Sequence, residues 1–178
     1  MATTQEDPRA GLKVGSRTAF TFFADVLPGH ERALRGYLEN SQGSPDTAAG
    51  LEEIGTLHDF RWVMFDEDRR IFFASSYDGG FTKYIQDFGS TRIGVLIDEA
   101  LQHVEGWVGI TDPGATEWFL EHAVPAVAYN GSYPEPSVKQ VWKALALQEA
   151  FEEVLDSPDA AEALQHPALK PLLEQAAD

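Results

Sequence analysis

The sequence contains no cysteine among its 178 residues. Disulfide bonds, thiolate metal sites, iron–sulfur clusters and a cysteine nucleophile are therefore excluded together. Basic residues are also scarce, because 13 Lys and Arg stand against 29 Asp and Glu, which gives a formal net charge of −16. Nucleic acids and anionic membrane surfaces are bound largely through Lys and Arg, so we expect neither as a partner.

Several familiar motifs are missing as well. No apolar run approaches the ~20 residues of a membrane-spanning helix, and residues 1–16 lack the hydrophobic stretch of a signal peptide. A Gly-rich phosphate loop, a G-x-S-x-G motif and a His-x-x-x-His pair are absent, which leaves nucleotide enzymes and common hydrolases without support. We expect a soluble, cytoplasmic protein that holds no metal.

The clearest structural signal is a β-hairpin in the middle of the chain. Residues 56–65 and 71–79 are rich in aromatic and β-branched side chains, and the charged run Asp66-Glu67-Asp68-Arg69-Arg70 separates them. Each face of the first strand carries both apolar bulk and an ionisable group. A sheet with one face in water shows a cleaner alternation, so we expect this hairpin to be covered on both faces.

The remaining pattern alternates strands and helices. In chain order it predicts a strand over residues 17–26, a helix over 30–40, a loop over 41–50, helices starting near Phe81, Ser90 and Asp112, a last strand over 124–129, and a long helix from Ser137 to about Asp156. This order is the ferredoxin-like, split βαββαβ arrangement of the α+β class. It places extra helices before the last strand and at the C-terminus.

Three segments follow from this assignment. Residues 1–16 are expected to be disordered, residues 17–156 to form the ferredoxin-like domain, and residues 157–178 to form a helical tail. The long helix is expected to turn a stripe of apolar side chains inward: Val138, Val141, Trp142, Leu145, Phe151 and Val154. Helices on one face of the sheet leave the other face to be covered, and a second copy of the chain would do this. We therefore expect a homodimer.

The run from Thr56 to Val63, followed by Ser75-Ser76-Tyr77-Asp78-Gly79, resembles segments of the dimeric α+β barrel superfamily. Members of that superfamily include antibiotic-biosynthesis monooxygenases, EthD-like proteins, polyketide cyclases and dye-decolourising haem peroxidases. The resemblance implies a small-molecule biosynthetic enzyme, a cofactor-independent oxygenase or cyclase, that acts on an aromatic or polyketide-like substrate in an apolar pocket. The alternatives are a haem-binding, peroxidase-like protein and a non-catalytic ligand-binding or dimerisation module.

His58 and Arg61 are the candidate catalytic residues. A histidine with a pKa near neutrality suits a general base, and an arginine can stabilise the anion that proton removal creates. The alternative for Arg61 is a buried ion pair with Asp59 or Asp78. On a regular strand the two side chains point to opposite faces. Either a bulge near Asp59 re-aims one of them, or only one of the two is functional. We favour His58 directed into a pocket together with Phe60 and Trp62, and Arg61 in an ion pair on the far face.

Other residues are candidates for binding a ligand rather than for chemistry. They are Phe60, Trp62, Tyr77, Asp78, His103, His122 and Tyr129. His103 and His122 would be the axial ligands if haem were bound. The structural alternatives are core packing for the aromatic side chains and a helix cap for Asp78.

Overall fold

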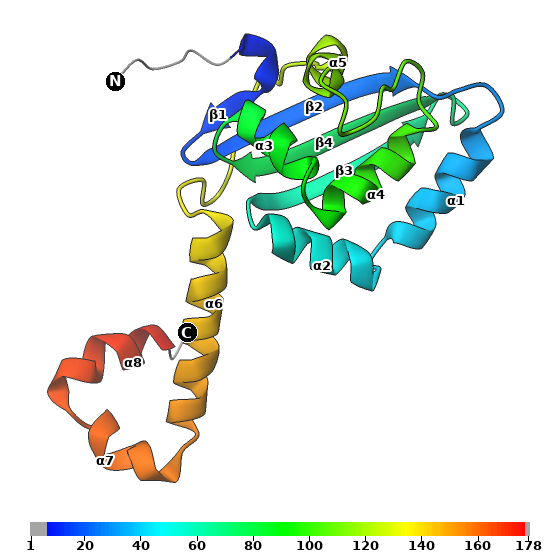
Figure 1. Cartoon of the computed structure of the whole chain (residues 1–178). Coiled ribbons are helices and arrows are strands. Elements are labelled where there is room, and N and C mark those ends of the chain that lie inside the picture. The colour runs from blue at the N-terminus through cyan, green and yellow to red at the C-terminus, as the bar shows by residue number, and fades with distance from the viewer. Residues whose placement is uncertain (1–6, 177–178) are drawn as a thin grey trace. The chain divides into compact units, whose positions relative to one another are not determined.

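The computed structural model describes residues 7–176, and Figure 1 shows the arrangement of its elements. The elements are η1 (Pro8–Ala10), β1 (Leu12–Val14), β2 (Arg17–Asp25), α1 (Glu31–Ser41), α2 (Pro45–Ile54), β3 (Leu57–Phe65), β4 (Arg70–Asp78), α3 (Phe81–Phe88), α4 (Arg92–Leu101), α5 (Ala115–His122), α6 (Val138–Leu155), η2 (Pro158–Ala160), α7 (Ala161–Leu164), η3 (Pro167–Leu169) and α8 (Lys170–Ala176). No helix within residues 7–176 is both long and apolar enough to cross a lipid bilayer.

The chain divides into two compact units, the first ending at Lys139 and the second beginning at Gln140. This boundary differs from the predicted one after residue 156. The predicted disordered segment 1–16 also contains η1 and β1, while residues 1–6 lie outside the described part. In α6 only Val138 is buried. Trp142, Leu145 and Val154 are 40%, 58% and 44% exposed, so the predicted inward stripe is wrong for these three side chains.

The first unit contains one antiparallel sheet with the strand order β1-β2-β4-β3. This confirms the α+β class, and the sheet has four antiparallel strands, as the predicted βαββαβ order implies. The fourth strand, however, is β1 and not the predicted strand over residues 124–129, of which only a single bridge forms, between Ala123 and Phe22. If that bridge continued as a ladder, residues 126–128 would pair with residues 17–19. Residues 17–19 already pair with β1, so the predicted strand cannot form there.

Helices cover one face of the sheet and build the core there (Figure 1). Phe22 of β2 stacks on Phe73 of β4, with ring centroids 5.3 Å apart, and also contacts Phe119 of α5 at 5.7 Å. Gly94 of α4 lies so close to α3 that an added Cβ would stand 1.7 Å from the carbonyl oxygen of Phe88. A glycine is therefore required where these two helices meet.

The opposite face of the sheet, which we call the open face, is covered differently at its two ends. At one end lies a strap, residues 129–138. Tyr129 Oη is 3.0 Å from Ser76 Oγ, and the backbone N–H of Val138 donates to Asp78 Oδ2 at 2.7 Å. At the other end an aromatic cluster remains partly exposed: Phe23, Phe65 and Phe72, with Val63 43% exposed beside it.

Candidate functional site

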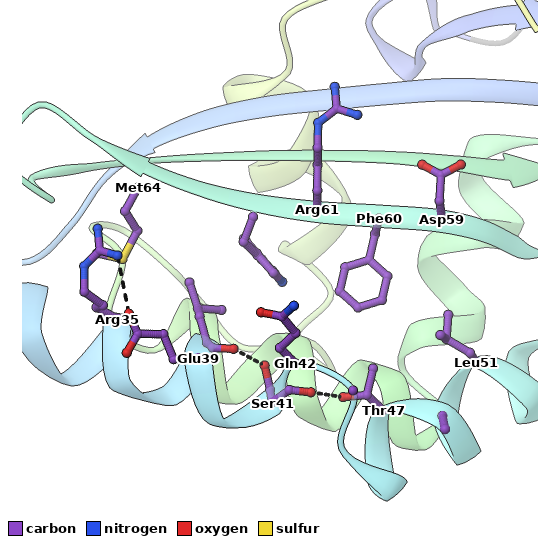
Figure 2. Close-up of a pocket in the computed structure, with 14 residues that line it drawn as sticks. Arg35, Glu39, Ser41, Gln42, Thr47, Leu51, Asp59, Phe60, Arg61 and Met64 are labelled. Carbon is purple, nitrogen blue, oxygen red and sulfur yellow. Dashed lines mark hydrogen bonds and ion pairs between the residues drawn. The ribbon is translucent and has the colours of Figure 1, made fainter.

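A pocket of about 610 Å³ lies between α1, α2 and β3 (Figure 2). Its apolar wall is formed by Leu38 of α1, Leu51 of α2, and Phe60, Trp62 and Met64 of β3. The three β3 residues alternate along the strand, so they share the face that is turned toward the helices. The volume lies within the usual range for small-molecule pockets.

The rim of this pocket is charged. Its charged side chains are those of Arg35, Glu39, Asp59 and Arg61, and the neutral amide of Gln42 lies among them. Arg35 pairs with Asp68 of the β3–β4 turn, and its Nη1 lies 3.6 Å from Glu39 Oε1. The Arg35 guanidinium lowers the pKa of the Asp68 carboxyl, so one rim cation is already largely neutralised by the protein itself.

Helix α2 forms one wall of the pocket but was predicted as a loop over residues 41–50. The side chain of Ser44 accepts a hydrogen bond from the backbone N–H of Thr47, and Pro45 opens the helix. Serine followed by proline and an acidic residue is a helix-start signal. This signal in Ser44-Pro45-Asp46 would have located α2 and, with it, Leu51.

The backbone of β3 adds hydrogen-bonding groups to the pocket. The N–H of Asp78 donates to the carbonyl oxygen of Thr56 at 2.8 Å, which fixes the alternation of bonds between β3 and β4. In an antiparallel pair every second residue points its N–H and C=O away from its neighbour. Phe60, Trp62 and Met64 are these residues, and β3 is an edge strand. Their backbone groups therefore point outward, beside the apolar wall.

The structure contains a bulge beside Asp59, one of the two alternatives, but the bulge sends His58 away from the pocket. Leu57 lies opposite Tyr77 and Asp59 opposite Ser76, so His58 is the extra residue. Its Nε2 lies 2.8 Å from Asp78 Oδ1 on the open face, and its side chain is 9% exposed. The expectation that His58 would share a pocket with Phe60 and Trp62 is wrong.

Asp78 holds two elements together around His58. One carboxylate oxygen contacts His58, while the other accepts the backbone N–H of Val138 at the start of α6. Asp78 is thus a capping carboxylate, as the structural alternative held, but for α6 rather than for the helix that follows it in sequence. Bonded in this way to Asp78, the imidazole is held in one orientation.

Arg61 lies on the open face at the rim of the pocket, on the side of β3 opposite Phe60 (Figure 2). It is exposed, and its Cζ lies 5.6 Å from the centre of the Phe72 ring. Among the described residues no carboxylate lies within ion-pair distance of Arg61, so the predicted buried ion pair with Asp59 or Asp78 is wrong. Arg61 therefore retains a free guanidinium.

The remaining candidates are distributed over the first unit. Tyr77 is a core residue, stacked on Tyr84 with ring centroids 3.7 Å apart, and its hydroxyl donates to the carbonyl oxygen of Ala10. Burial raises the pKa of the Tyr84 hydroxyl, which donates to Ser75. Tyr129 belongs to the strap and contacts Ser76. Tyr77 and Tyr129 therefore lie on opposite faces of the sheet.

The two candidate haem ligands, His103 and His122, are not among the residues that line the pocket. His103 Nδ1 is 3.0 Å from His30 Nδ1, and burial together with the neighbouring His30 lowers the pKa of His103. His122 stacks on Trp118, and its Nδ1 lies 2.8 Å from the Trp118 carbonyl oxygen. Within residues 7–176 no group of three or more His, Asp or Glu side chains is arranged to hold a metal ion.

Comparison with known proteins gives little further guidance. No family model matches the chain, and no curated protein matches it. Among solved structures, a NIPSNAP family protein from Agrobacterium tumefaciens is similar at 8% identity and a TM-score of 0.37, over 53% of this chain and 82% of that one. A likeness this distant says nothing about activity.

Proposed function

We propose that the chain binds a small, mainly apolar molecule in the pocket between α1, α2 and β3. The observation that carries this proposal is the convergence of five apolar side chains on about 610 Å³ of space between two helices and an edge strand. The apolar wall suits an aromatic or polyketide-like body. The outward backbone groups of β3 and the Gln42 amide would orient the polar substituents of such a molecule.

A neutral fluorescent probe, N-phenyl-1-naphthylamine, tests this proposal. Ala48 of α2 lines the pocket and is exposed, so Ala48→Trp should fill the space without disturbing the core. Ala33 is an exposed alanine of α1 outside the lining, which makes Ala33→Trp the matched control. We expect Ala48→Trp to raise the dissociation constant of the probe at least tenfold, about 1.4 kcal/mol. Equal affinities in the two variants would reject the pocket as the binding site.

His58 supports a second candidate function, the enzymatic one. We propose that His58, oriented by Asp78 at 2.8 Å, accepts a proton from an acidic C–H of a substrate. In a cofactor-independent oxygenase the resulting carbanion reacts with O₂. Anthrone is a suitable probe, because anthrone plus O₂ gives anthraquinone plus water. Oxygen uptake should fall at least tenfold in His58→Gln, about 1.4 kcal/mol of barrier. A rate in His58→Gln equal to that of the wild type would eliminate this function.

We also propose that the protein is a homodimer that buries the aromatic cluster of the open face. Large apolar patches on proteins in water usually mark an interaction site. Val63 lies beside the cluster and is 43% exposed, while Val95 on α4 is 55% exposed and belongs to another surface. In sedimentation velocity, Val63→Lys should give a monomer and Val95→Lys should remain dimeric. A monomeric wild type at micromolar concentration would contradict the proposal.

A further inference from the structure

Arg17, the first residue of β2, is a buried cation without an anionic partner. The residue is 8% exposed, and its Nε has no hydrogen-bond acceptor. Among the described residues none forms an ion pair or a hydrogen bond with this guanidinium. The contact it does make is with the ring of Tyr133 in the strap, whose centroid lies 5.1 Å from Cζ. Buried charged groups are normally paired, because desolvating an ion costs several kcal/mol.

The carboxylate of the adjacent residue, Asp78, does not form an ion pair with Arg17. Asp78 lies directly opposite Arg17 in the β2–β4 register, on the same face of the sheet. Its two oxygens are engaged by the His58 ring and the Val138 backbone N–H, at 2.8 and 2.7 Å. It therefore stays beyond ion-pair distance of Arg17. Asp78 is thus bonded to His58 and Val138, and the Arg17 guanidinium can take an external hydrogen-bond acceptor as its partner.

We propose that Arg17 anchors a binding site for the carboxylate of a small monoanionic ligand beneath the strap. The guanidinium presents N–H donors in a planar fork, which matches the two oxygens of a carboxylate. A doubly charged phosphate or sulfate would suffer more repulsion from Asp78 on the neighbouring strand. Tyr133 covers the guanidinium, while Tyr133 itself is 63% exposed. Movement of this one side chain uncovers Arg17 without disturbing the core.

The proposal is tested by titrating the full-length protein with sodium benzoate at constant ionic strength. The Arg17 Nε–H resonance in the NMR spectrum reports directly on an acceptor, and benzamide is the neutral probe of the same shape. We expect benzoate to shift this resonance in a saturable manner and benzamide to leave it in place. A resonance that benzoate does not move, or that benzamide moves equally, would overturn the proposal.

Variants give a second measurement. Arg17→Gln should weaken benzoate binding at least tenfold in calorimetry, whereas Arg32→Gln, a change at an exposed arginine of α1, should leave it unchanged. If Arg17→Gln does not fold, the wild-type NMR titration alone decides. Sulfate that binds more tightly than benzoate would refute the assignment to a monocarboxylate. Benzoate affinity that is equal in wild type and Arg17→Gln would refute the role of Arg17.

Discussion

Replacing Asp78 tests whether this single carboxylate joins the hairpin to the start of α6. The side chain is 14% exposed and accepts two short hydrogen bonds, from the His58 ring at 2.8 Å and from the Val138 N–H at 2.7 Å, besides a longer one from Ser16 Oγ at 3.5 Å. A hydrogen bond to a charged group contributes about 1.5–3 kcal/mol to stability. Asp78→Asn keeps one oxygen acceptor and should lose about one such bond. Asp78→Ala loses both and should cost roughly twice as much.

Two measurements check this prediction. The melting temperature should fall by roughly 3–12 °C in Asp78→Asn, since each kcal/mol shifts a chain of this size by about 2–4 °C. The backbone N–H of Val138 should also lose its protection against hydrogen exchange in Asp78→Ala. Glu52→Gln, at an exposed acid of α2, should change neither quantity and serves as the control. If Asp78→Ala melts within 1 °C of the wild type and Val138 stays protected, the carboxylate does not join these segments.

Three further predictions concern other parts of the first unit. The turn residues Asp66, Glu67 and Asp68 all have positive φ, a backbone conformation that strains most residues other than glycine. Glu67→Gly should therefore stabilise the protein by about 1 kcal/mol in urea titrations. An unchanged urea midpoint would show that Glu67 is not strained. Gly94→Ala should destabilise by about 1–3 kcal/mol, because the new Cβ meets the Phe88 carbonyl oxygen, and wild-type stability would contradict the close approach. The pKa of His103 is lowered in the folded protein, so the unfolded chain binds more protons and stability should fall as the pH drops below about 6.5. His103→Asn should reduce that acid sensitivity of the melting temperature, and a pH profile identical to that of the wild type would exclude His103 as its source.

The hairpin, the α+β class and most helices were predictable from the sequence because they depend on local patterns. Runs of aromatic and β-branched residues on either side of a charged turn define β3 and β4. The spacing of Phe81, Tyr84, Ile85 and Phe88 defines α3, where the structure buries all four. Helix α2 could also be predicted from the sequence, because Ser44 is a typical helix cap. These features follow from periodicity and capping, which act over a few neighbouring residues.

The site was decided by tertiary contacts. Pairing between Leu57 and Tyr77 and between Asp59 and Ser76 makes His58 the bulged residue, and the sequence of β3 alone does not reveal which face such a residue joins. Likewise, β1 occupies the edge of β2 because residues far apart in sequence compete for the same backbone groups. The unpaired state of Arg17 has the same origin, since it depends on which partners Asp78 finds in β3 and α6.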